Sequence, residues 1–157
     1  MDNPVRLMLV DIRSAHNVGA LFRTADAIRV EKLYLCGVTP LPIDRFGRAV
    51  GAITKTALGA EHTVAWEHVT DTLVCIKALK KEGWDIVAVE QDARAQDYKT
   101  YLCNKPTVLL LGEEVGGLTH DLLDQCDAII EIPMRGKKES LNVSVAAGVV
   151  LYRLRDL

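Results

Sequence analysis

Long apolar runs are missing from this chain of 157 residues. A helix that crosses a bilayer needs roughly 20 consecutive apolar residues, and no segment approaches that length. The N-terminal sequence MDNPVRLMLV also lacks the basic region and the small-residue cleavage site of a signal peptide, and it is typical of a first strand. These absences predict a protein without a membrane span or a leader.

Cysteine pairs at metal-binding spacing are missing as well. Cys36, Cys75, Cys103 and Cys126 are widely spaced and form no CxxC pair. Neither a zinc site nor a disulfide framework is indicated, so we expect no metal. We expect reduced thiols that pack as small, partly buried hydrophobic groups, which agrees with a cytoplasmic location.

A large net charge is also absent. The chain carries a formal net charge of −2, which argues against an indiscriminate nucleic-acid binder. The charges are nevertheless unevenly distributed, because residues 1–60 hold eight Lys and Arg against five Asp and Glu. This excess indicates either a local basic surface or ordinary solvated charges.

Apolar residues make up 49% of the chain and charged residues 25%, as in typical globular domains. Strand and helix patterns alternate from end to end, without linker, repeat or low-complexity segment. This alternation predicts one α/β domain, a mostly parallel sheet with helices on both faces. The expected strands are 6–10, 32–36, 62–66, 85–90, 107–111 and 128–132, and the expected helices are 17–28, 49–60, 69–81, 119–125 and 141–154.

Ligands of such sheets bind beyond the carboxyl ends of the strands, and the loop after the first strand has unusual residues. Asn17 stands where the first helix is expected to begin, so it is a candidate N-cap. Gly19 lies one turn before Arg23 and would leave room for a bulky partner to approach the guanidinium. The alternative is that Arg23 forms a surface salt bridge with Asp26 or Asp11.

The second unusual loop is LLLGEEVGGL, at 109–118. It is neither a dinucleotide fingerprint, which needs GxGxxG, nor a phosphate loop, which needs Gly-Lys-Ser/Thr. Glu113 and Glu114 would repel phosphate and would suit a cationic or hydroxyl-rich ligand. The alternative is a turn with solvated glutamates.

The third is the junction IPMRGKKESLNVSVAAGVVLYRL, at 132–154. Ser140, Asn142 and Ser144 stand there in apolar surroundings, and burying such groups costs roughly 1–3 kcal/mol each unless they are hydrogen-bonded. They therefore either cap the backbone or hold a ligand. Ser140 is expected to be the N-cap and to share a helix face with Ser144. The helix behind them is apolar all round, which predicts burial by its own domain and, as one option, by a second subunit.

Together the three loops resemble, in order, the motifs of the SPOUT superfamily, in its SpoU/TrmH-type branch of RNA 2′-O-ribose methyltransferases. The first motif is Asn17-x-Gly19-x-x-x-Arg23-Thr24, the second is LLLGEEVGGL and the third is IPMRGKKESLNVSVAAG. The resemblance implies a deep trefoil knot in the C-terminal part, S-adenosylmethionine as cofactor, and a homodimer with the active site near the subunit interface.

The resemblance also implies roles for individual residues. The implied cofactor-binding residues are Leu111, Gly112, Glu113, Ile132, Pro133, Met134 and Leu141. The implied catalytic residues are Asn17, Arg23, Glu114, Ser140 and Asn142. In this family the arginine of the first motif is a proposed general base. A guanidinium that stays charged and stabilises the developing alkoxide, or binds the adjacent phosphate, does not have to lose a proton first.

Relatives often add an RNA-binding domain, whereas this chain starts at the first strand and stops at the last helix. We therefore expect a single SPOUT domain over 1–157, with RNA held by the core dimer or by a helper protein. The candidate RNA contacts are Arg13, Arg45, Arg48 and Lys55, most of them in or near the loop 38–51. The alternative for that loop is a mobile surface segment.

The resemblance predicts an S-adenosylmethionine-dependent methyltransferase acting on a ribose 2′-hydroxyl of structured RNA. We favour tRNA over rRNA because a minimal core suits a compact substrate. A base-methylating SPOUT enzyme is one alternative, although the NxGxxxRT element resembles the ribose-modifying branch. A non-catalytic RNA-binding or ribosome-associated module is another, and the intact motif residues oppose it.

Overall fold

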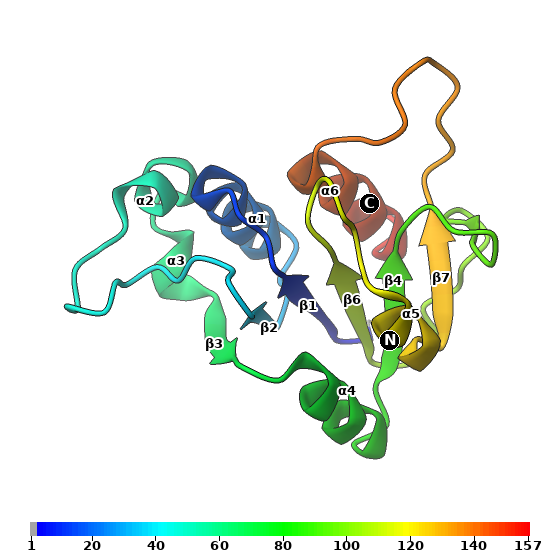
Figure 1. Ribbon diagram of the computed structural model, residues 1–157, viewed down its shortest axis with the longest axis horizontal. Helices are drawn as coiled ribbons and strands as arrows, with labels where there is room; N and C mark the ends of the chain where they lie inside the picture. The colour runs from blue at the N-terminus through cyan, green and yellow to red at the C-terminus, as the bar shows by residue number, and fades with distance from the viewer. Residues whose placement is uncertain (1–2) are drawn as a thin grey trace.

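The computed structural model describes residues 3–157 and places one seven-stranded sheet between two layers of helices (Figure 1). Every strand pair is parallel, in the order β3-β2-β1-β6-β4-β7-β5. The strands are β1 (Val5–Val10), β2 (Lys32–Cys36), β3 (Ala65–Val69), β4 (Asp85–Val89), β5 (Gln96–Asp97), β6 (Thr107–Leu111) and β7 (Ala128–Glu131). The helices are α1 (Ala15–Ala27), α2 (Gly51–Ala57), α3 (Ala60–Thr63), α4 (Thr72–Lys81), α5 (His120–Gln125) and α6 (Val143–Leu154).

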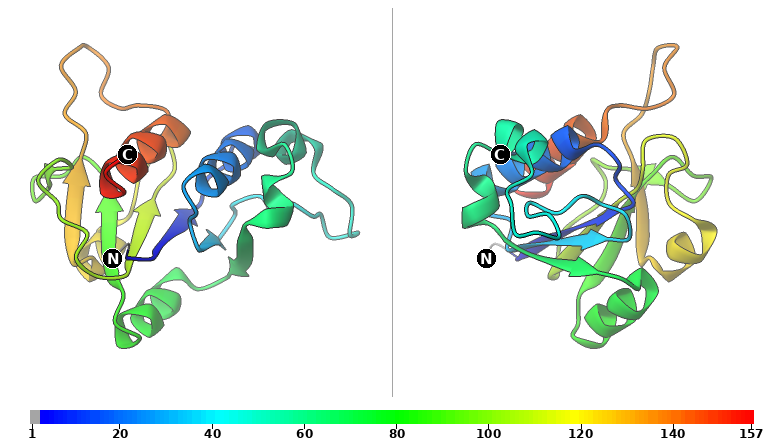
Figure 2. Two further views of the ribbon diagram at one scale, coloured as in Figure 1. Left: turned by 180° about the vertical axis from the view of Figure 1, so that it is seen from behind. Right: turned by 60° about the vertical axis from the view of Figure 1, so that its left-hand side comes forward.

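The central strands are buried on both faces, which explains their nearly continuous apolar sequences. In β1, Leu7 and Leu9 join the core cluster under α1, α2, α3 and α6, whereas Met8 and Val10 join the cluster under α4 and α5. The two helical layers lie on opposite sides of the sheet in the right-hand view of Figure 2. The predicted fold class is thus confirmed, while the trefoil knot stays a prediction. Within residues 3–157, no helix is long and apolar enough to cross a membrane.

Two predicted helix caps are wrong. The cap of α1 is Ser14, whose Oγ accepts a hydrogen bond from the backbone N–H of Asn17 at 3.2 Å. The cap of α6 is Asn142 and not Ser140, and its Oδ1 accepts from the backbone N–H of Ser144 at 2.9 Å. Ser140 therefore lies outside the helix and shares no helix face with Ser144.

The segment between β2 and α4 differs most from the prediction. The helix expected at 49–60 is broken because Leu58 and Gly59 have left-handed backbone angles, with φ values of 52° and 94°. The strand expected at 62–66 lies at Ala65–Val69, since α3 takes up the preceding residues. The helix expected at 69–81 begins at Thr72, after the capping carboxylate of Asp71. The two-residue edge strand β5 was not predicted.

All four cysteines are free thiols, and Cys36, at the end of β2, is fully buried in the core cluster under α4 and α5. Burial raises the pKa of the Cys36 thiol to about 12, because it disfavours the thiolate. Because the folded state favours the neutral thiol, protonated Cys36 contributes to stability at pH values below 9.0, the ordinary pKa of a cysteine thiol. That contribution is lost as the pH rises from there toward the folded-state pKa.

We expect Cys36 to resist alkylation in the native protein at pH 8, because its thiol is both protonated and inaccessible. Cys103 is only partly buried and serves as the internal control. Timed iodoacetamide labelling with peptide mass spectrometry measures both sites in one sample. Equal labelling rates at the two cysteines in the folded protein would contradict the packing described for Cys36.

Candidate functional site

A cavity of about 290 Å³ lies at the carboxyl ends of three adjacent strands. Val89 at the end of β4, Leu111 at the end of β6 and Glu131 at the end of β7 line it, together with the N-terminal turn of α6. This is the edge where parallel sheets bind ligands. Of the residues predicted to bind a cofactor, the structure brings six to this cavity and leaves Pro133 out. The six are Leu111, Gly112, Glu113, Ile132, Met134 and Leu141.

The second motif forms one wall of the cavity as a tight loop. A Cβ atom at Gly112 would lie 2.7 Å from the backbone carbon of Gly117 and 2.8 Å from the backbone nitrogen of Leu118. Gly117 has a φ of 63°, which glycine adopts without strain. A bridge between Glu113 and Gly117 closes the turn. The glycines therefore let the loop fold back on itself beside the cavity.

Glutamates dominate the charge of the cavity. Its lining contains Glu90, Glu113, Glu114, Glu131 and Glu139. Arg13 pairs with Glu113 at 3.1 Å, while Glu90 accepts a hydrogen bond from the backbone N–H of Leu118 at 3.1 Å. Carboxylates attract cations and accept hydrogen bonds from hydroxyl groups. Across residues 3–157, no group of His, Cys, Asp and Glu is arranged to hold a metal ion.

A chain of hydrogen bonds joins the three loops at the rim of the cavity. Asn17 donates from Nδ2 to Oε1 of Glu114 at 2.8 Å, and Asn142 donates from Nδ2 to Oδ1 of Asn17 at 3.2 Å. Oδ1 of Asn142 also accepts from the Ser144 hydroxyl at 2.6 Å. Asn17, Glu114 and Asn142 were predicted as catalytic residues, and the structure brings them together. Ser140 lines the cavity beside them.

Arg23 stands apart from this group. It is exposed on α1, does not line the cavity, and forms no ion pair with any residue from 3 to 157. Asp26 instead accepts a hydrogen bond from the Thr63 hydroxyl at 2.6 Å, and Asp11 accepts from the backbone N–H of Val38 at 3.0 Å. The alternative of a surface salt bridge from Arg23 is therefore wrong.

The role suggested for Gly19 is also wrong. Gly19 is buried against α2, where an added Cβ would collide with Oγ1 of Thr56 and the carbonyl oxygen of Ile53. The Thr56 hydroxyl donates to the carbonyl oxygen of His16 at 2.9 Å, which ties the two helices together. The glycine thus permits close packing of α1 on α2 and makes no room beside Arg23.

We expect Gly19→Ala to lower the free energy of unfolding by about 2–3 kcal/mol, because the new methyl group overpacks a helix contact. Gly51→Ala is the matched control, since Gly51 starts α2 and a Cβ there meets nothing within 4 Å. The control should change stability by about 0.5 kcal/mol or less. Urea unfolding followed by circular dichroism measures both variants, and equal midpoints would contradict the packing argument.

The candidate RNA contacts occupy separate places. Arg13 lies beside the cavity through its ion pair with Glu113, and Lys55 lies in the last turn of α2. Arg45 and Arg48 flank the ring of Phe46, at 4.8 Å and 5.0 Å from its centroid. Backbone N–H groups of Phe46 and Arg48 donate to the Asp44 carboxylate and hold this part of the loop 38–51 in place.

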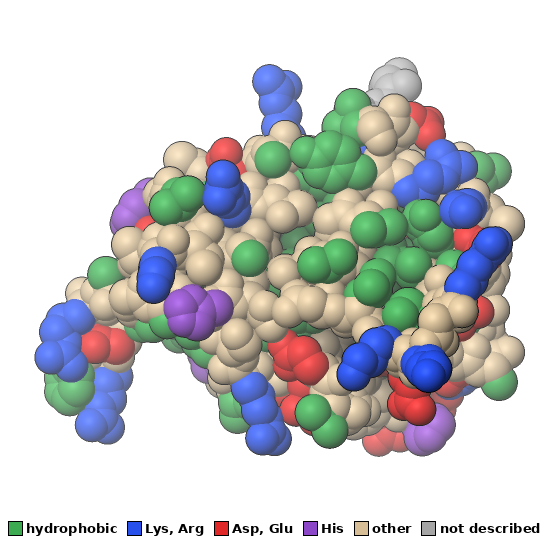
Figure 3. Space-filling view, turned by 90° about the horizontal axis from the view of Figure 1, so that it is seen from above, with side chains coloured by type: hydrophobic (Ala, Val, Ile, Leu, Met, Phe, Trp, Pro, Cys, Tyr) green, Lys and Arg blue, Asp and Glu red, His purple; other side chains and the backbone are tan. Residues whose placement is uncertain are grey.

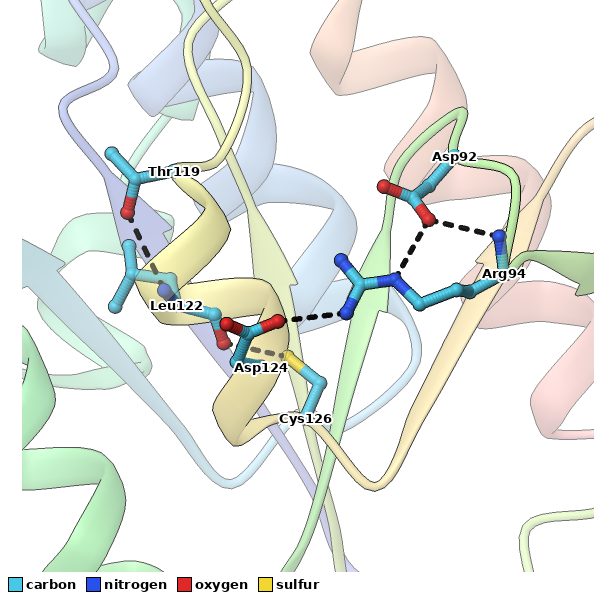
Figure 4. Close-up of polar contacts among 6 residues, drawn as sticks. All are labelled: Asp92, Arg94, Thr119, Leu122, Asp124 and Cys126. Atoms are coloured by element: carbon cyan, nitrogen blue, oxygen red, sulfur yellow. Dashed lines mark hydrogen bonds and ion pairs between the residues drawn. The ribbon is translucent and has the colours of Figure 1, made fainter.

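An ion-pair cluster joins the loop after β4 to α5 (Figure 4). Arg94, in the loop after β4, contacts Asp92 at 3.0 Å and Asp124 of α5 at 2.8 Å. The two carboxylates raise the pKa of Arg94, and hydrogen bonds from Arg94 lower the pKa of Asp92. Through these ion pairs, α5 holds the segment that follows Glu90 and Gln91. Both of these residues line the cavity.

A model of the SpoU rRNA Methylase family matches residues 4–152 of this sequence. The chain belongs to the SpoU rRNA Methylase family. It is 34% identical over 154 residues to the 23S rRNA (guanosine-2′-O-)-methyltransferase RlmB of Neisseria meningitidis. The match covers 97% of this chain and 58% of the Neisseria protein.

Solved structures agree with membership of the SpoU family. An AdoMet-bound rRNA methyltransferase from Sinorhizobium meliloti superimposes with a TM-score of 0.87 and 29% identity, covering 99% of this chain and 57% of that one. A TrmH/SpoU tRNA modifying enzyme from A. aeolicus superimposes with a TM-score of 0.83 and 28% identity, covering 99% and 75%. This SpoU chain thus spans less than two thirds of the Neisseria and Sinorhizobium proteins.

Sequence reasoning missed three glutamates of the cavity in this SpoU chain: Glu90, Glu131 and Glu139. Glu90 follows β4 directly and Glu131 ends β7, so both stand at carboxyl ends of parallel strands. Because parallel sheets bind ligands at the carboxyl ends of their strands, this position in the sequence could have identified both glutamates as cavity residues. Glu139 had no such signal, because its place depends on how the loop before α6 folds back over the sheet.

Proposed function

We propose that this chain is an S-adenosylmethionine-dependent methyltransferase that modifies a ribose 2′-hydroxyl of structured RNA. The observation that carries the proposal is the cavity at the ends of β4, β6 and β7, lined by the second and third motifs and bordered by the hydrogen-bonded Asn17, Glu114 and Asn142. Family membership and the AdoMet-bound relative from Sinorhizobium meliloti support the choice of cofactor.

The cavity residues fit the proposed cofactor chemically. The glutamate-rich lining suits ribose hydroxyls and the positive charge of a sulfonium, and a group with several phosphates would be repelled. Backbone groups at Leu111–Glu113 and at Ile132 and Met134, with the side chain of Leu141, would hold the ligand. S-adenosylmethionine supplies an electrophilic methyl group when bound, so the protein's main task is to orient the ribose hydroxyl toward it.

The hydrogen-bonded rim has a positioning role in this proposal. Asn17 connects Glu114 to Asn142 through both ends of its amide, so each group fixes the orientation of the next. Such a network keeps polar groups aimed at the mouth of the cavity, where the ribose would enter. Ser140 lies beside it and can hydrogen-bond the same substrate.

For the substrate, we propose structured RNA as the class. The preference for tRNA over rRNA rests only on the small size of the chain's core. The relatives' names include both kinds of RNA: 23S rRNA for the Neisseria protein and tRNA for the A. aeolicus protein. Labelled S-adenosylmethionine and total RNA from a strain lacking this protein test the proposal. Label should reside in alkali-resistant dinucleotides, and label on a base nitrogen would overturn it.

We also propose that the active form is a homodimer in which Arg23 of one subunit serves the cavity of the other. Arg23 lies six residues after Asn17 in α1, which places it about 9 Å along the helix and roughly 240° around it. One helix cannot therefore present both side chains to the same cavity. The helix is also fixed, since α1 packs tightly on α2 and α6.

The surface of α6 supports a subunit interface. Val145, Val149 and Tyr152 are 51%, 36% and 43% exposed, although the helix is almost wholly apolar. Figure 3 shows hydrophobic side chains gathered on this face of the molecule, seen from above. A Cβ at Gly148 would meet only Cγ2 of Thr24, at 4.0 Å, so no contact among residues 3–157 requires a glycine there. A closely approaching second helix would require it.

A further inference from the structure

The segment 43–49 forms a fixed hairpin that projects from the molecule, at the far left of Figures 1 and 3. Ile43 and Ala49 form an antiparallel bridge at its base. One carboxylate oxygen of Asp44 accepts hydrogen bonds from the backbone N–H groups of Phe46 at 2.8 Å and Arg48 at 2.9 Å. The tip is thus held by hydrogen bonds between its backbone and the Asp44 carboxylate.

The hairpin presents an aromatic ring with two cations close to it. The Phe46 side chain is 66% exposed, and the guanidinium carbons of Arg45 and Arg48 lie 4.8 Å and 5.0 Å from its ring centroid. Arg48 is also anchored to Asp44 at 3.0 Å. Arg45, in contrast, forms no ion pair within residues 3–157, so its guanidinium is free to leave the ring.

This combination of groups matches the chemistry of an unpaired nucleotide. Bases stack on exposed aromatic rings in proteins that bind single-stranded or looped RNA, and guanidinium groups pair with the flanking phosphates. The only carboxylate of the tip, Asp44, is already engaged with the backbone and with Arg48, and its pKa is lowered by those hydrogen bonds. The hairpin therefore offers a polyanion two cations and little repulsion.

We propose that Phe46 is a stacking platform for an unpaired base of the substrate RNA, with Arg45 and Arg48 contacting the adjoining phosphates. When a base binds, the Arg45 guanidinium leaves the ring face and turns to a phosphate, while Arg48 stays anchored. The inference rests on the proposed function and makes it narrower: besides the target ribose, the methylated RNA has an unpaired nucleotide that reaches the hairpin.

The test compares Phe46→Leu and Phe46→Trp in the full chain. The probes are an RNA hairpin with a single-stranded loop and a fully paired duplex, both followed by fluorescence anisotropy. Phe46→Leu should weaken binding of the looped RNA by about 10-fold, because a stacking contact is lost. Phe46→Trp should bind it at least as well as the native chain, and duplex binding should change by less than about 2-fold in both variants.

Further arms separate the contributions. Val38→Ala is the matched control, since Val38 is another exposed apolar residue of the same loop and should leave both affinities unchanged. Arg45→Gln should reduce the slope of binding against salt concentration by about one phosphate contact. A 2-aminopurine placed in the loop should be quenched by the native chain and not by Phe46→Leu.

Looped-RNA binding by Phe46→Leu at the native affinity would overturn the inference, and so would an equal loss for loop and duplex. The latter result would mean that the side chain only supports the hairpin or contacts another partner. A different result would contradict the proposed methyltransferase function and leave the stacking role of Phe46 standing. In that case no variant, nor the native chain, transfers methyl groups to RNA, while the loop-specific loss of affinity at Phe46 persists.

Discussion

Arg23→Ala is expected to lower single-turnover methyl transfer by about 10²- to 10³-fold, the range found when a donor to a developing oxyanion is removed. The side chain of Arg23 forms no hydrogen bond or ion pair with any other described residue, so its guanidinium donors are available to the RNA. Affinity for S-adenosylhomocysteine should stay within about 2-fold, because Arg23 does not line the cavity.

Arg23→Lys should be almost as damaging, since lysine lacks the planar fork that pairs with an oxyanion or a phosphate. The measurement is a single-turnover assay with labelled cofactor and saturating RNA, with calorimetry of S-adenosylhomocysteine alongside. Lys77→Ala is the control: Lys77 is exposed on α4, across the sheet from α1, and should keep the native rate. Near-native methylation by Arg23→Ala would eliminate both the base and the electrostatic role.

The central fold could be predicted because its sequence signals are strong. β6 is fully buried and, apart from Thr107, apolar, and β1 contributes alternate residues to the two core clusters. The edges of the sheet carry weaker signals. β5 has only two residues, and most of β3 is solvent-exposed, so hydrophobic pattern does not fix the bounds of either strand.

Much of the membership of the site was predictable from the sequence, but the connections between its residues were not. Residues of the three motifs stand where parallel strands end, and that position gathers them at one edge. The caps were assigned wrongly because several small polar residues compete for each helix start. Ser14 caps α1 and so leaves the Asn17 amide free, and the tertiary contact with Glu114 then decides where that amide points. The sequence shows which small polar residues can cap each helix start, but the tertiary contacts decide which of them does.

Mixing two inactive homodimers should restore methyl transfer if Arg23 acts across the subunit interface. Arg23→Ala removes the guanidinium, and Gly112→Ala disturbs the cavity, because its Cβ would press on the backbone of Gly117 at 2.7 Å. Each variant alone leaves every site defective. In a mixed dimer, the native cavity of the Arg23→Ala subunit meets the native Arg23 of the other subunit.

The expected recovery is about one quarter of native activity, since random exchange makes about half of the dimers mixed and each mixed dimer has one intact site. The assay mixes the purified variants after brief partial unfolding and refolding, with each variant refolded alone as control. Asn142→Ala is a second cavity partner if Gly112→Ala folds poorly, because it breaks the contact to Asn17 and leaves the glycine loop intact.

The two arrangements give opposite results. If Arg23 served its own cavity, each site of a mixed dimer would contain one defect, and mixing would restore nothing. The orientation of α1 favours recovery, since Asn17 contacts Glu114 at the cavity rim while Arg23 points away on another side of the same fixed helix. In the proposed homodimer, the exposed apolar face of α6 would then have a catalytic consequence, because covering it with a second subunit would complete each site.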